Sequence, residues 1–62
     1  MNRRFHLMDL GYDLVETGYS MNMQGFYNKK SEFEHKYKGK DIKFYRAKSD
    51  TKGLIAWELW IR

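Results

Sequence analysis

The sequence contains no cysteine. No disulfide can therefore stabilise the chain, no thiolate can bind a metal, and cysteine-based nucleophilic catalysis is excluded. Long apolar runs are also absent, since the longest are a few residues and a membrane-spanning helix needs roughly 20. The sequence has no basic start followed by an apolar stretch, which is the pattern of a signal peptide. These absences predict a soluble protein of the cytoplasm.

Patterns typical of catalysis and of nucleotide binding are missing as well. His6 and His35 are the only imidazoles, whereas a zinc site needs about four ligands, usually in closely spaced pairs. No Gly-x-Gly-x-x-Gly or Walker loop is present to hold phosphates, and no glycine-rich elbow surrounds any serine. We therefore expect a protein that is not an enzyme and that has no catalytic residue, cofactor or metal site.

Aromatic residues are abundant: the 62 residues include four Phe, five Tyr and two Trp. A chain of this length forms one domain, near the lower size at which a protein folds without disulfides or metals. Each aromatic ring buries on the order of 150 to 250 Å² when it is fully covered. We therefore predict a single small domain over residues 1–62 that is stabilised by aromatic burial.

The last ten residues, 53–62, give the clearest structural signal. Apolar side chains recur at every second position, which puts them on one face of a strand. They are Ile55, Trp57, Leu59 and Ile61. The opposite face is mixed and contains Leu54, Ala56, Glu58, Trp60 and Arg62. The pattern predicts a core-facing strand with Trp57 inside and Trp60 outside.

The start of the chain predicts a short helix. Asn2 can cap it, residues 3–10 carry an apolar stripe, and Gly11 is typical of the position that follows a helix. A second interpretation continues the helix to Val15, because the helical spacing of apolar residues also extends that far.

The middle of the chain predicts strands. Residues 12–16 alternate, Thr17-Gly18 indicates a turn, residues 19–24 alternate again, and 28–31 is a polar loop. Residues 33–37 and 41–47 then form a hairpin around Gly39, and the polar segment 48–53 leads into the terminal strand.

The predicted fold class is therefore α+β: one short amino-terminal helix packed on the apolar face of an antiparallel sheet of about four strands joined as meander hairpins. The predicted core consists of Phe5, Met8, Leu10, Leu14, Ile42, Phe44, Ile55, Trp57, Leu59 and Ile61.

The net charge is +4, and most basic residues lie in the second half of the chain. A basic patch could meet nucleic acid or an acidic protein. The simpler interpretation is that these lysines keep a small aromatic protein in solution.

The mixed face of the terminal strand is the candidate binding surface. An aromatic centre with a charged rim is typical of protein interfaces. The predicted partner-binding residues are Tyr45, Trp60, Lys36, Lys43 and Arg62. We expect a non-catalytic protein-binding module, in which Trp60→Ala weakens association and Trp57→Ala unfolds the domain. Alternatively, the segment 24–31 or a second subunit covers Trp60, and a homodimer belongs to the same class of function.

A second hypothesis is single-stranded nucleic-acid binding, because sheet aromatics stack on bases while lysines follow the phosphates. The candidate residues are the aromatics Tyr27, Tyr37, Tyr45 and Trp60, interleaved with Lys29, Lys36, Lys38 and Lys43. Acidic residues among these lysines oppose it.

The segment Leu10-Gly11-Tyr12-Asp13-Leu14-Val15-Glu16, followed by Tyr- and Lys-rich strands, resembles small uncharacterised proteins of phages and mobile elements of Gram-positive bacteria. The resemblance implies an accessory factor or inhibitor that acts on a host protein, and it brings no catalytic residue.

Overall fold

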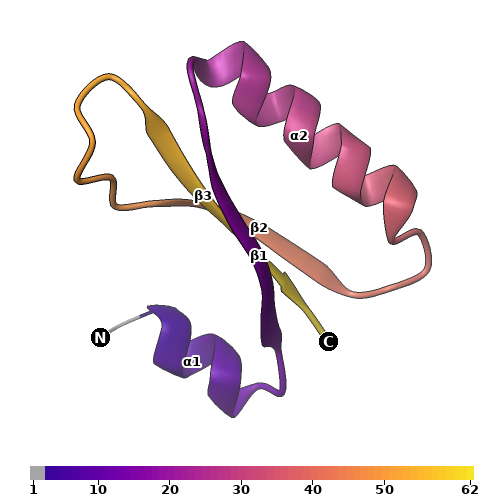
Figure 1. Cartoon of the computed structure of the whole chain (residues 1–62). Helices are drawn as coiled ribbons and strands as arrows, with labels where there is room; N and C mark the ends of the chain where they lie inside the picture. The colour runs from indigo at the N-terminus through magenta and orange to yellow at the C-terminus, as the bar shows by residue number, and fades with distance from the viewer. Residues whose placement is uncertain (1–2) are drawn as a thin grey trace.

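The predicted terminal strand is the central strand of the sheet in the computed structural model, which describes residues 3–62. The described residues form two helices and three strands (Figure 1). In chain order they are α1 Arg3–Asp9, β1 Asp13–Ser20, α2 Met23–Lys36, β2 Ile42–Ala47 and β3 Ile55–Ile61. The strand order is β1-β3-β2, and both pairs are antiparallel. The α+β class is confirmed, but the prediction of one helix and about four strands is wrong in both numbers.

The strand predicted at 19–24 is wrong beyond Ser20, because β1 ends there and α2 begins at Met23. Helix α2 also replaces the polar loop predicted at 28–31 and the strand predicted at 33–37. Phe33 and Tyr37 are four residues apart, a spacing that fits both the two-residue period of a strand and one turn of a helix. Asn22 decides the local structure, because its side chain accepts a hydrogen bond from the Gly25 N–H at 2.9 Å and caps the helix. Gly39, expected in a hairpin turn, instead joins α2 to β2 with a φ of 87°.

The main core lies between α2 and the sheet. Phe26 and Phe33 of α2 pack against Trp57 and Leu59 of β3, and Phe44 of β2 lies against them. The alternation of β3 was therefore interpreted correctly, since Ile55 and Ile61 also face this core. We call this side of the sheet the α2 face.

Strand β1 continues through Thr17-Gly18, where a turn was expected. On the α2 face, the indole of Trp57 lies across Gly18: a Cβ added to Gly18 would be 2.5 Å from Cζ2 of that ring. The glycine thus lets an aromatic side chain cover the strand. A β-bulge between Leu14 and Glu16 shifts the register of β1 against β3.

Helix α1 ends as predicted. Gly11 has a φ of 90°, its N–H bonds to the Met8 carbonyl, and the Tyr12 N–H bonds to the Leu7 carbonyl, which is the Schellman arrangement. The proposed Asn2 cap lies outside the described residues. The alternative helix that continues to Val15 is wrong, because β1 begins at Asp13.

Helix α1 packs on the opposite side of the sheet from the predicted one. Leu7 is buried with Tyr12 and Trp60, and Tyr45 packs against them. Figure 1 shows α1 and α2 on opposite sides of the strands. We call this second side the α1 face. The predicted core residues Phe5, Met8, Leu10 and Leu14 are exposed, so their assignment to the core is wrong.

Candidate functional site

The predicted aromatic centre of the docking surface, Trp60, is not at the surface. Its side chain is only 2% exposed, and Leu7 of α1 and Tyr12 cover it. The mixed face of β3 is therefore a second small core, and the prediction that Trp60 lies outside is wrong. The cover is the amino-terminal helix, neither the segment 24–31 nor a second subunit.

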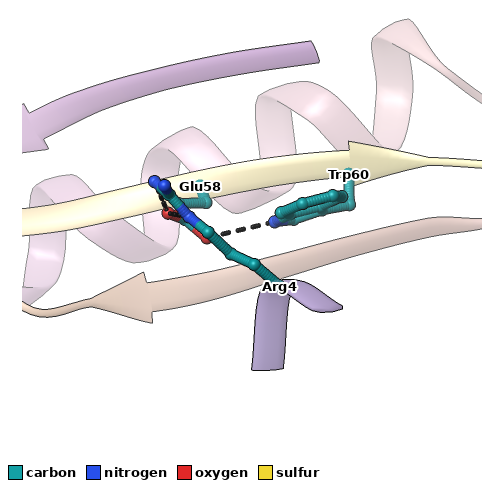
Figure 2. A network of polar contacts seen from close by, with 3 residues as sticks. All are labelled: Arg4, Glu58 and Trp60. Carbon is teal, nitrogen blue, oxygen red and sulfur yellow. Dashed lines mark hydrogen bonds and ion pairs between the residues drawn. The ribbon is translucent and has the colours of Figure 1, made fainter. Parts of the chain in front are cut away.

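A buried carboxylate lies beside Trp60 on the α1 face (Figure 2). Glu58 is only 7% exposed. Its Oε2 accepts a hydrogen bond from Arg4 Nε at 2.7 Å and is also paired with Arg4 Nη2, while its Oε1 accepts from Trp60 Nε1 at 3.1 Å. The carboxylate holds the pKa of Arg4 above its ordinary value. These contacts give both carboxylate oxygens of Glu58 a hydrogen-bond donor, so Glu58 anchors α1 to the sheet.

Tyr12, just before β1, contacts Asp41, just before β2, and Arg62, just after β3. Its hydroxyl donates to Asp41 Oδ2 at 2.7 Å, and Arg62 Nη2 donates to the same oxygen at 2.7 Å. The hydrogen bond from Tyr12 and then the charge of Arg62 lower the pKa of Asp41, and the same bond raises the pKa of Tyr12. The Arg62 guanidinium lies 4.8 Å and Lys43 Nζ 6.0 Å from the centre of the Tyr12 ring.

Four of the five predicted partner-binding residues thus gather around one core. Lys43, Tyr45 and Trp60 share the α1 face, and Arg62 packs on Tyr12. Lys36 does not join them, because it is at the end of α2, 5.4 Å from the ring centre of Tyr37.

The residues of the nucleic-acid hypothesis do not share a sheet face. Tyr27, Lys29 and Lys36 belong to α2, Tyr37 follows that helix, and Trp60 is buried. The stacking surface expected on the sheet is therefore wrong for these residues.

The α1 face has a hollow beyond the short helix, with a volume of about 520 Å³. Ala47 and Ala56 are cross-strand neighbours there, and their small side chains leave the space open. Thr17 and Tyr19 of β1 and Tyr45 of β2 also line it, together with Arg4, Lys48 and Glu58.

The exposed large apolar side chains all come from the first half of the chain. Every large apolar side chain that the structure describes as exposed lies between Phe5 and Tyr27. In β1 these are Leu14 (41% exposed), Val15 (47%) and Tyr19 (55%). Among the described strands, none pairs with the outer edge of β1. We call Leu14, Val15, Tyr19 and this edge the β1 surface.

Sequence reasoning missed the β1 surface because it put Leu14 in the core and read Thr17-Gly18 as a turn. The sequence does contain one indication of this surface: residues 5–27 include no Lys or Arg, although the whole chain has 12 Lys and Arg residues.

Residues 3–62 contain no group of three or more side chains that could hold a metal ion. No helix within them is long and apolar enough to cross a membrane. Comparison of the chain with protein-family models, curated proteins and solved structures finds no match.

Proposed function

We propose that this protein is a non-catalytic protein-binding module that docks its partner on the β1 surface. The observation that carries the proposal is an eight-residue edge strand with exposed apolar side chains and an unpaired outer edge. Such an edge presents backbone N–H and C=O groups to another chain. Recognition by addition of a strand uses these groups for affinity and the neighbouring side chains for specificity.

The other edge of the sheet supports the choice of β1. Natural sheets protect an edge with charged residues, especially lysine. Strand β2 has Lys43 and Arg46 and is followed by Lys48, whereas β1 has no basic residue. The edge of β2 thus has the basic side chains that most strongly disfavour pairing, whereas the edge of β1 has two carboxylates, a β-bulge and exposed apolar side chains.

The resemblance of the Leu10 to Glu16 segment to small phage proteins supports a host protein as the partner. That segment includes the first half of β1, so the part of the chain that carries the resemblance is also the part that we propose to bind.

The test is an affinity pull-down from bacterial lysate, run with and without nuclease treatment. Val15→Lys puts a charge on the exposed edge of β1, and we expect it to reduce capture of the partner at least about tenfold, a loss of about 1.4 kcal/mol. Tyr27→Lys, a similar change at an exposed position of α2, should leave capture unchanged.

Thermal melts of both variants establish that they remain folded. Capture that survives Val15→Lys would overturn the proposal. Capture that nuclease abolishes would favour nucleic acid, and a dimeric mass by light scattering that Val15→Lys makes monomeric would show that a second copy occupies β1.

A further inference from the structure

We infer that the partner segment at β1 is an extended strand in which apolar and basic side chains alternate. The inference rests on the proposed docking at β1 and adds the chemistry of the occupant. It comes from the distribution of charge over the two faces of the strand.

The register with β3 assigns each residue of β1 to a face. Asp13 is opposite Ile61 and Glu16 is opposite Leu59, so both carboxylates lie on the α2 face. Leu14 is opposite Trp60 and Tyr19 is opposite Ala56, so these side chains lie on the α1 face. Leu14 and Tyr19 are an odd number of residues apart, so in a regular strand their side chains would face opposite sides of the sheet. The β-bulge at Val15 changes the alternation and puts both on the α1 face.

A strand added to β1 would place its own side chains directly beside these two rows. Cross-strand neighbours stabilise a sheet when apolar residues meet and when opposite charges meet, and like charges in that position are unfavourable. The partner therefore needs basic side chains toward the α2 face and apolar ones toward the α1 face. Because successive residues of a strand alternate faces, the two requirements give one alternating sequence.

Among the described side chains, no ion pair joins Asp13 or Glu16 to a basic group, although the charge of Glu16 acts on Lys29 of α2. Asp13 and Glu16 are exposed, and residues 5–27 provide no Lys or Arg to pair with them. Lys29 of α2 is held by Glu32 at 2.9 Å. Its pKa is raised first by that hydrogen bond, with the charge of Glu16 as the smallest cause.

A second copy of this chain does not match these requirements. Its β1 would bring further carboxylates to the same edge. Its β2 has Lys43 opposite Trp60 and Arg46 opposite Trp57, so the two basic side chains are on opposite faces.

The hollow on the α1 face extends the apolar row. Thr17 and Tyr19 form its β1 side, and the floor continues to Ala56 and Ala47. An apolar side chain of the added strand that lies beside Tyr19 is next to this hollow and can fill part of it.

The test uses two capped synthetic peptides of about eight residues, the length of β1. One alternates valine and lysine, and the other alternates valine and glutamate. Backbone NMR shifts of the intact protein report where each peptide binds and how tightly. We expect the lysine peptide to bind at β1 at least about tenfold more tightly than the glutamate peptide.

Two variants separate the possible outcomes. The double variant Asp13→Asn, Glu16→Gln should remove the preference for lysine, while Asp50→Asn, at an exposed loop position, should keep it. Equal binding of the two peptides, binding of neither, or a preference that survives the double variant would overturn the inference. If capture in the pull-down still depends on Val15 but not on Asp13 and Glu16, the proposed docking on β1 is supported. The inferred alternation of apolar and basic residues in the partner is then wrong.

Discussion

Trp57 and Trp60 belong to one strand but to two different cores. Trp57 packs with Phe33 and Phe44 under α2, and Trp60 packs with Leu7 and Tyr12 under α1. Their indole nitrogens also differ: Trp60 Nε1 donates to Glu58, whereas Trp57 Nε1 is buried without a partner among the described residues. The two side chains therefore contribute to stability in different ways.

We expect Trp57→Ala and Trp60→Ala each to lower the free energy of unfolding by about 3 to 5 kcal/mol, because both truncate a buried aromatic ring. The domain's total stability is of similar size, so either variant should be largely unfolded. Urea denaturation followed by circular dichroism measures the loss. A folded Trp60→Ala variant of nearly unchanged stability would contradict the packing of α1 on the sheet.

The phenylalanine variants separate packing from hydrogen bonding. Trp57→Phe and Trp60→Phe remove the same atoms, but only the second breaks a bond to a carboxylate, worth about 1.5 to 3 kcal/mol. Trp60→Phe should thus be the more destabilising of the two.

At the scale of single residues, the alternation in β3 correctly predicted which side chains face the main core, but the prediction that Trp60 is exposed was wrong. Alternation shows that Trp57 and Trp60 point to opposite faces, and that was confirmed. It does not show that both faces are covered. The cover depends on Leu7 and on the long-range pair of Arg4 with Glu58, 54 residues apart, which no local pattern contains.

At the scale of the element, β1 depends on the contact between Gly18 and the Trp57 indole. Glycine normally weakens a strand and often marks a bend or a close approach. Here the close approach is the reason for glycine, since the indole occupies the place of a side chain. The sequence alone favoured a turn, because the residue that covers Gly18 is far away in the chain.

Gly18→Ala should destabilise the protein by about 1 to 3 kcal/mol, because the added methyl group overlaps a buried ring that has little room to move. Gly25→Ala is the matched control. A Cβ there would meet its neighbours at 3.6 Å, an ordinary contact, and alanine favours a helix, so we expect unchanged or increased stability. Thermal melts compare the two, and equal effects would show that the indole does not cover Gly18.

Helix α2 is the element that the sequence pattern predicted wrongly. Phe33 and Tyr37 fit both periods, and alternation alone predicted strands and a loop there; the structure has a helix that Asn22 caps. Helix α1, β2 and β3 were predicted close to their observed bounds, since each has a clear period and a glycine at its end.

At the scale of the whole molecule, Asp41 joins three distant segments. It accepts hydrogen bonds from Tyr12 before β1 and from Arg62 at the end of β3, while the Asp41 carbonyl accepts from the Arg62 N–H at 2.9 Å. The lowered pKa of Asp41 means that its ionised form is favoured by folding.

The sign of the pH effect follows from this lowered pKa. Stability from Asp41 is present above its ordinary pKa of 3.8 and is lost as the pH falls through the lower value of the folded state. Asp41→Asn should therefore be less stable than the wild type at about pH 7, and the difference should shrink at about pH 2. Denaturant midpoints at the two pH values measure it, and a difference independent of pH would contradict the role of the charge.

The charge of the molecule is also arranged on the large scale. Strand β2 at one edge of the sheet has Lys43 and Arg46, while β1 at the other edge has carboxylates and exposed apolar side chains. The composition showed an excess of lysine but not where these residues lie in the fold. The predicted meander put consecutive strands side by side, whereas the observed order β1-β3-β2 puts β1 and β2 at opposite edges of the sheet.

The most direct test of the docking surface is site-specific photo-crosslinking in cells. A photoreactive phenylalanine analogue is placed at Val15 of β1 in one variant and at Arg46 of β2 in another. Docking on β1 predicts a discrete protein adduct from position 15 and none from position 46. Adducts from position 46 alone, or adducts to nucleic acid from either position, would contradict it.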